Sequence, residues 1–252
     1  MRAAAFLVMM LVASARPVDA AEIRVLSAGA MKLVVAELGE QFARETGHTV
    51  TIVDSGPVGV MQKRLMDGEA ADVIVLSDTG IDFLAGKGFV LGGSRTDLAR
   101  TAIGVAVREG APRPDISTAE AFKRALLEAK SITYVDPARG ATSGVHFAGV
   151  LERLGIVDQM KPKTVLVQGG AAAEKLVTGE AEICVHQISE ILPVKGVTLV
   201  GPLPKELQKI TTYSAGIPAR VSAPEAATAF VQFMARPAVK PRLAEMGLDY
   251  RE

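Results

Sequence analysis

The chain has 252 residues, of which 49% are hydrophobic, and its 28 basic and 28 acidic side chains give a formal net charge of zero. This length allows one large domain or two modest lobes, and the balanced charge, without a basic stripe, argues against a nucleic-acid partner. The one cysteine, Cys184, excludes an intrachain disulfide, and the lack of tryptophan argues against a site that stacks sugars.

The first residues have the order of a secretory signal peptide. A charged start at Met1-Arg2 precedes an apolar run at 3–13 and a small-residue stretch at 18–21. We expect a signal peptide over 1–21, cleaved near Ala20/Ala21, with export to the periplasm through the Sec pathway. The apolar run is about half of the ~20 residues that span a bilayer, so no membrane insertion is expected. The alternative is a buried N-terminal helix.

Short β-branched runs then alternate with amphipathic segments, which predicts an α/β fold with mixed, mostly parallel sheets flanked by helices. The predicted strands are 23–26, 49–53, 72–76, 102–107, 131–135, 164–167, 182–186 and 210–217. The predicted helices are 31–45, 57–66, 118–128, 143–154, 171–177, 224–234 and 238–246. The pattern restarts after the strand at 102–107, which indicates a second structural unit.

A weak internal sequence similarity, here called the internal echo, supports two related halves. The segments 64–70 and 175–181 each contain a helix end, a glycine and the approach to a strand. Because such units recur in many α/β proteins, the echo carries little weight alone.

Four turns that follow predicted strands combine small residues with the start of a helix. The first turn of a helix leaves about four backbone N–H groups without partners, and its positive dipole end favours an anion. Glycine lets a ligand approach the backbone, and hydroxyls add donors. For any single turn, ordinary helix capping is the better explanation, because such caps are frequent, so the case for binding depends on several turns converging on one cleft. The candidate ligand-binding residues in these turns are Ser27, Gly29, Ala30, Met31, Ser55, Gly56, Pro57, Val58, Arg139, Thr142, Ser143, Gly144 and Gly170.

Other chemistries have little support in the sequence. None of the turns matches a nucleotide-binding motif. Cys184 and His186 share one face of a predicted strand, but the histidines lack zinc-like spacing, so we expect no metal site and no cofactor. Cys184 lies in an apolar strand and is expected to be a buried, inert thiol.

With these residues in place, the chain resembles the periplasmic molybdate-binding protein family, within the type 2 periplasmic binding fold. The resemblance covers nearly all of the mature chain. It rests on 23–32, Asp67–Val73, Asp136-Pro137, Leu154-Gly155, Gly179–Ala181 and Met246–Leu248.

The resemblance implies two lobes joined by a hinge of two crossing strands. Lobe 1 would comprise 22–104 plus 215–252 and lobe 2 would comprise 105–214, with the hinge around Ala102 and Ala215. Closure around a small anion is the hinge motion of such proteins. The implied partners are the anionic ligand and membrane subunits of an ABC-type importer, and a monomer is expected.

The chain departs from the family where molybdate is held. Members of the family that hold molybdate use serines in the first two turns and a tyrosine in the second lobe. The matching positions in this chain are Ala30, the stretch Ser55–Gly59, and His186. Unmade buried hydrogen bonds cost ~1–3 kcal/mol each, which argues against molybdate. Arg139 and His186 could instead supply cationic donors to a carboxylate.

The divergent pattern also resembles the bacterial aconitate isomerases, which share this fold and move a proton along a tricarboxylate. Such chemistry needs anion donors and one group that takes and returns a proton. His186 is the first candidate for that group and Tyr213 the second, although both could simply be buried packing residues. The leading interpretation is therefore a solute-binding protein for a small anion, and the alternative is an isomerase that uses the same cleft. A periplasmic signalling or partner-binding module is a third class.

Overall fold

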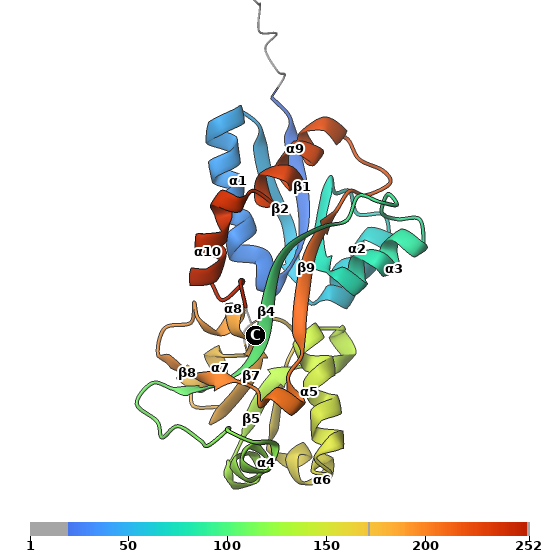
Figure 1. Cartoon of the computed structure of the whole chain (residues 1–252). Coiled ribbons are helices and arrows are strands. Elements are labelled where there is room, and N and C mark those ends of the chain that lie inside the picture. Colours follow the sequence, from blue (N-terminus) through green and yellow to red (C-terminus); the bar gives the residue numbers. More distant parts are fainter. Residues whose placement is uncertain (1–19, 171, 251–252) are drawn as a thin grey trace, which may run out of the picture.

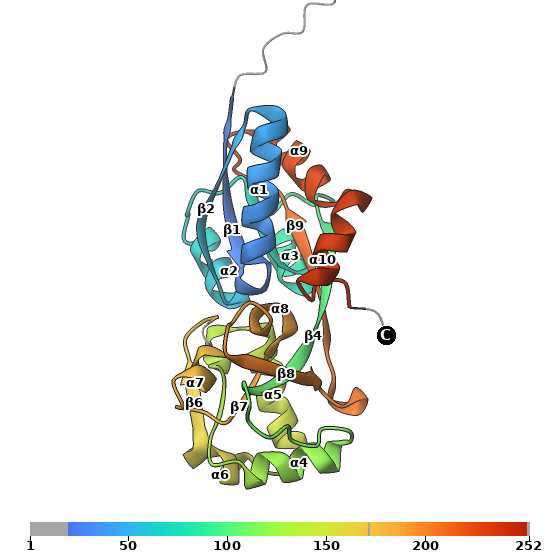
Figure 2. The same ribbon diagram turned by 90° about the vertical axis from the view of Figure 1, so that its left-hand side faces the viewer.

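The computed structural model describes residues 20–170 and 172–250, which form two lobes stacked end to end (Figures 1 and 2). Most of the predicted signal peptide, residues 1–19, lies outside the described residues. Among the described helices, none is long and apolar enough to cross a bilayer.

The first lobe is built on a sheet in the order β2-β1-β3-β9-β4. Strand β1 pairs in parallel with β2 and β3, whereas β9 runs antiparallel to both β3 and β4. The sheet is therefore mixed. Its strands are β1 Glu22–Ala28, β2 Thr49–Gly56, β3 Val73–Ser77, β4 Thr96–Arg108 and β9 Ile210–Gly216.

The second lobe continues from β4 into a sheet that contains β7, β5 and β6, with β8 on the other edge of β4. Strands β5, β6 and β7 are parallel to one another, and β4 is antiparallel to β7 and β8. The predicted α/β fold with mixed sheets is thus confirmed, with parallel and antiparallel strand pairings in equal number among the described strands. The new strands are β5 Ile132–Val135, β6 Thr164–Val167, β7 Ile183–Gln187 and β8 Val197–Pro202.

Helices flank both sheets (Figure 1). In the first lobe these are α1 Lys32–Thr46, α2 Val58–Met66, α3 Asp78–Gly86, α9 Pro224–Met234 and α10 Lys240–Glu245. In the second lobe they are α4 Ala119–Glu128, α5 Thr142–Arg153, α6 Val157–Met160, α7 Glu174–Val177 and α8 Ile188–Ile191. Short 3-10 turns are η1 Gly29–Met31, η2 Pro137–Arg139, η3 Lys161–Lys163, η4 Lys205–Leu207 and η5 Pro237–Val239.

Strands β4 and β9 run between the lobes (Figure 1). On β4 the change of sheet falls between Ala102, which pairs with Ile210 in the first sheet, and Ile103, which pairs with Gln187 in the second. On β9 the passage is nearer to Ile210 than to Ala215, because Ala215 pairs with Val75 inside the first sheet. The expected lobe boundaries stay a prediction.

Each lobe buries its own apolar core. The first contains Phe42 and Phe230, whose rings lie 5.2 Å apart, and the second contains Tyr134 and Phe147, whose rings lie edge to face at 5.0 Å. The second lobe has a further apolar cluster that includes Cys184, which is fully buried. Burial raises the pKa of the Cys184 thiol. This agrees with the expected inert thiol.

The Ala71-Asp72-Val73 motif has a structural explanation. Asp72 is 1% exposed, and its carboxylate accepts hydrogen bonds from the Arg24 N–H at 2.9 Å and from the Ser222 N–H and hydroxyl at 2.7 and 2.6 Å. It therefore ties β1 and the approach to α9 to the start of β3. Buried carboxylates persist when they are hydrogen-bonded in this way.

The internal echo also has matching local structure. Gly68 and Gly179 follow α2 and α7 with φ angles of 97° and 77°, a region in which a side chain would be strained. In each segment an ion pair joins a residue before the glycine to one after it, Arg64 to Glu69 and Lys175 to Glu180. The two halves thus end a helix before a strand by the same means.

Candidate functional site

The four predicted turns converge on one cavity between the lobes. Its walls come from the end of β1 and η1, the start of α2, the start of α5, the turn after β6, and β7. The cavity volume is about 20 Å³, which is room for about one water molecule. A ligand of several atoms therefore requires the lobes to move apart.

Most of the candidate residues lie together around this cavity, with Tyr213 of β9 beside them. The lining includes the predicted residues Gly29, Ala30, Gly56, Pro57, Val58, Thr142, Ser143, Gly170, His186 and Tyr213. Ala171, at the end of the fourth turn, lies outside the described residues, and α7 begins later than predicted, at Glu174.

Five candidates do not line the cavity. Ser27 is buried and its hydroxyl donates to the Ala28 carbonyl at 3.0 Å, and Met31 is packed in the first core. Ser55 lies beside an adjoining chamber. Arg139 is exposed on η2, and Gly144 packs against the backbone of Val135. The expected cationic donor at Arg139 is therefore absent from the described cavity wall.

His186 is held at the back of the cavity, where it is 2% exposed. Its Nδ1 lies 3.1 Å from the hydroxyl of Ser143 on α5, and its Nε2 lies 3.5 Å from Oε1 of Glu190 on α8. Nε2 has no hydrogen-bond partner among the described residues. This nitrogen is thus available beside a carboxyl group.

Glu190 is the central residue that the sequence reasoning missed. Its side chain is 14% exposed, and it lines the cavity between glycines of the two lobes. A Cβ added at Gly29 would lie 2.6 Å from Glu190 Oε1, and one added at Gly170 would lie 3.0 Å from it. Both glycines therefore leave room for this carboxyl group. The sequence feature that could have indicated Glu190 is its position as the one charged residue in the short, mainly apolar stretch after β7.

Burial displaces the pKa values of this pair in opposite directions. Desolvation raises the pKa of Glu190 to about 8 and lowers the pKa of His186 to about 4. At neutral pH both groups are mainly uncharged, so the Glu190 carboxylic acid can donate a hydrogen bond. Paired groups whose pKa values move apart are a frequent feature of acid–base sites.

A polar network joins the lobes where β9 passes the cavity. The Gln187 side-chain amide donates to the Thr142 hydroxyl at 2.8 Å and to the Thr211 hydroxyl at 3.2 Å, and the Tyr213 hydroxyl lies 3.2 Å from that of Thr142. Burial raises the pKa of Tyr213. Tyr213 therefore keeps its proton at neutral pH and joins this network as a neutral hydroxyl, and its role as a proton carrier stays a prediction.

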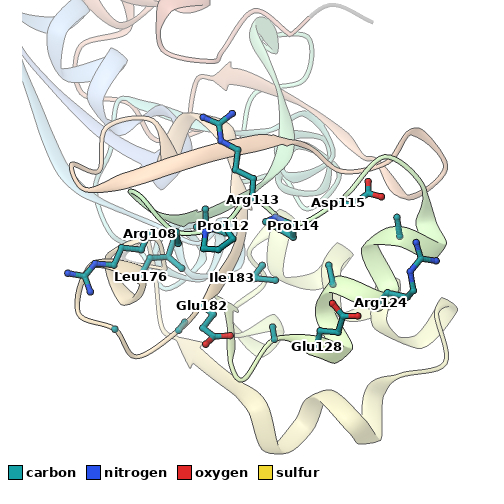
Figure 3. A pocket seen from close by; sticks show the side chains of 17 residues that line it. Arg108, Pro112, Arg113, Pro114, Asp115, Arg124, Glu128, Leu176, Glu182 and Ile183 are labelled. Carbon is teal, nitrogen blue, oxygen red and sulfur yellow. The ribbon is translucent and has the colours of Figure 1, made fainter.

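A larger cavity lies at the far side of the second lobe, between α4 and the ends of β4 and β7 (Figure 3). It measures about 580 Å³ and is bordered by three arginines. In Figure 3 the guanidinium groups of Arg108, Arg113 and Arg124 point away from one another. Because these donors do not converge, the smaller cavity between the lobes is the better candidate site.

The lobes also touch through glycine backbones beside the cavity. The Gly59 N–H of α2 donates to the Gly140 carbonyl at 3.3 Å. A Cβ added at Gly59 would lie 3.0 Å from the Arg139 carbonyl oxygen and 3.1 Å from Gly140 Cα. Only glycine permits this approach without a shift.

The Gly59→Ala substitution is expected to weaken ligand binding about tenfold without lowering stability, because it obstructs the closed arrangement of the lobes. Alanine is the better helix former by about 1 kcal/mol, so α2 itself gains stability. Isothermal titration and thermal unfolding test both parts. The control is Gly86→Ala in α3, where an added Cβ meets nothing within 4 Å and no loss of affinity is expected. Unchanged affinity in Gly59→Ala would contradict a role for this contact.

Comparison with known proteins places this architecture in a family. Residues 23–249 match the model of the bacterial extracellular solute-binding proteins. Aconitate isomerase from a Pseudomonas species is 32% identical over 240 residues, which cover 93% of this chain and 89% of that protein. The molybdate-binding protein of Azotobacter vinelandii is 27% identical over 179 residues, 69% of this chain and 67% of the relative.

A molybdate-binding protein is also similar in fold. The solved structure of the Azotobacter vinelandii periplasmic molybdate-binding protein superimposes with a TM-score of 0.74 over 91% of this chain and all of that one, at 21% identity. The predicted resemblance to both the molybdate-binding proteins and the aconitate isomerases is confirmed.

Proposed function

Because this chain belongs to the bacterial extracellular solute-binding protein family, we propose that it binds a small carboxylate anion between its two lobes. The observation that carries the proposal is the convergence of four helix-opening or glycine-rich turns, drawn from both lobes, on one cavity. Backbone N–H groups at helix starts suit an anion. As part of the proposal, the protein acts in the periplasm and presents the bound anion to an ABC-type importer.

The donor set favours a carboxylate over a tetrahedral oxyanion. Ala30, Pro57 and Val58 offer no side-chain donor, so the hydroxyls at the cavity come from Thr142, Ser143 and Tyr213. A carboxylate presents two oxygens, whereas a tetrahedral oxyanion presents four, each costly to bury unpaired. The hydroxyl of the protonated Glu190 adds a neutral donor, which can donate a hydrogen bond to a carboxylate oxygen of the ligand.

A ligand screen tests the proposal. A ligand that binds only the folded state at 100 times its Kd adds about 2.7 kcal/mol to the unfolding free energy. Citrate, cis-aconitate or trans-aconitate is expected to raise the thermal midpoint, with molybdate, tungstate, sulfate and phosphate giving smaller shifts. A larger shift with molybdate, or none with any anion, would contradict the assignment.

Glu190 and His186 favour a second function, an isomerase of the aconitate type. The chemistry takes a proton from the methylene carbon of cis-aconitate, shifts the double bond to that carbon, and returns the proton to the far carbon of the former double bond. A carboxylate whose conjugate acid has a raised pKa is a stronger base than an ordinary one, which suits Glu190. The 32% identity to an aconitate isomerase supports this role.

Turnover separates the two functions. Incubation with cis-aconitate, followed by chromatography, is expected to yield trans-aconitate if the second function holds. Binding of the acid without product would leave the solute-binding role alone. His186→Ala is the companion variant, because full turnover in it would exclude His186 as the proton carrier.

A further inference from the structure

A second chamber adjoins the cavity between the lobes. It measures about 330 Å³ and shares the wall residues Gly29, Ala30, Gly56, Gly170 and Glu190 with the inner cavity. The inner cavity has room for about one water, whereas the chamber is at the lower end of the ~300–1,000 Å³ typical of small-molecule sites. Glu190 thus lies at the junction of the two spaces.

Lys32 brings a positive charge to the chamber wall. It is exposed at the first residue of α1, and its ammonium group forms no ion pair within 4.0 Å with a carboxylate of the described residues. A cation in the first helical turn opposes the helix dipole, and α1 has no acidic residue there. The stability of α1 therefore does not account for Lys32.

A buried hydroxyl of the same wall lacks a partner. Ser189 lines the chamber and is 6% exposed, and its Oγ has no hydrogen-bond partner among the described residues. Buried hydroxyls are normally paired, and each exception calls for a reason. The hydroxyl is closed off from solvent in this arrangement, so a polar ligand group would supply that partner once the lobes move apart.

We infer that the chamber is a second subsite, in which Lys32 and the Ser189 hydroxyl hold a further carboxylate of the ligand. The inference rests on the proposed function. One carboxylate lies among the turns at the inner cavity, and the carbon chain passes Glu190 into the chamber. The ligand class is therefore a di- or tricarboxylate of several carbons, rather than a single tetrahedral oxyanion or a monocarboxylate.

Glu174 is the opposing charge on this wall. It is exposed and lines the same chamber, but it forms no ion pair with Lys32 within 4.0 Å. If Glu174 rather than Lys32 bound the second ligand group, that group would be a cation such as an ammonium group. Lys32 is favoured because the first subsite already selects an anion, and because Ser189 can donate to a carboxylate.

Titration calorimetry with Lys32→Met tests the inference. Citrate, tricarballylate and glutarate serve as polycarboxylate probes and acetate as the monocarboxylate probe. Loss of one charge-assisted hydrogen bond is expected to weaken polycarboxylate binding about tenfold or more and to leave the weak acetate binding unchanged. The matched control is Lys240→Met, since Lys240 is the exposed first residue of α10 and lies outside the chamber. Glu174→Gln is expected to tighten polycarboxylate binding.

Other results would overturn the second subsite, the assignment of an anion to the chamber, or the proposed function. Unchanged polycarboxylate affinity in Lys32→Met, or equal losses for polycarboxylates and acetate, would overturn the second subsite while leaving the proposed function intact. Weaker binding in Glu174→Gln would overturn the assignment of an anion to the chamber. If the unaltered protein bound no carboxylate, both the subsite and the proposed function would fail.

Discussion

Replacing Glu190 with glutamine is expected to abolish the pH dependence of anion binding near pH 8. In the native protein the pKa of Glu190 is raised to about 8, so above that pH a buried carboxylate faces the anionic ligand. Affinity should then fall by up to about tenfold per pH unit, since the ligand favours the protonated form. The amide of the Glu190→Gln variant stays neutral, so calorimetry should show similar affinities at pH 6 and pH 9.

If the protein is an isomerase, Glu190→Gln is also expected to lower turnover by at least about 100-fold, because an amide cannot carry the proton. The binding measurement at pH 6 is the control for a correctly formed site. An affinity in the native protein that does not change between pH 6 and pH 9 would contradict the role of Glu190 in both functions.

The same pair gives stability a defined dependence on pH. The raised pKa of Glu190 means that its stabilising contribution is complete below about pH 4.5 and is lost as pH rises to about 8. The lowered pKa of His186 has the opposite sign, so its contribution is present above about pH 6.5 and is lost toward pH 4. The effects oppose one another between about pH 4.5 and 6.5. From pH 6.5 to 8.5 the ligand-free native protein should lose stability relative to Glu190→Gln.

The Gly144→Ala substitution is expected to lower the free energy of unfolding by about 3 kcal/mol, the upper end for overpacking. An added Cβ would lie 2.2 Å from the Val135 carbonyl oxygen and 3.0 Å from its carbonyl carbon. Both atoms belong to the backbone of β5, so relief requires α5 to move away from the sheet. Because Thr142 and Ser143 begin this helix, ligand affinity should fall as well.

Gly149→Ala is the control for Gly144→Ala, since Gly149 lies in the same helix and an added Cβ meets nothing within 4 Å. It should be neutral or stabilising by up to about 1 kcal/mol, the helix-propensity difference. Chemical denaturation of both variants measures the contrast. Equal stability of the two would show that α5 does not pack this closely on β5.

Much of the fold could be predicted from hydrophobic periodicity, because most elements are long enough to show a period. The strand at 164–167 and the helix at 224–234 have the predicted bounds. Helix α8 has four residues, too few for a helical period, and β8 contains Gly201 in a short run. Neither was predicted, and α8 carries Glu190.

The helix α3 was also missed, although Ser77 caps it by accepting a hydrogen bond from the Gly80 N–H at 3.2 Å. The strand at 102–107 was predicted too short, because its first half, from Thr96, joins the other lobe's sheet. A crossing strand pairs with two sets of partners, and that pairing depends on the tertiary arrangement rather than on local sequence.

The site was predictable as a set of turns but not as a set of side chains. Turn chemistry is local, so glycines and hydroxyls after strands indicate helix starts in the sequence. The direction of a side chain depends on packing, which is why Arg139 proves exposed and Met31 buried in the core. The displaced pKa values of Glu190 and His186 likewise arise from burial that only the folded chain provides.

Backbone amide NMR during titration with the polycarboxylate that gives the largest thermal shift tests most directly whether both lobes share one anion site. The largest amide shifts are expected at the cavity turns of both lobes, at Ala30 and Val58 in the first and at Ser143 and Gly170 in the second. Shifts confined to one lobe, or centred on the arginine-bordered cavity near Arg113 and Arg124, would contradict this expectation.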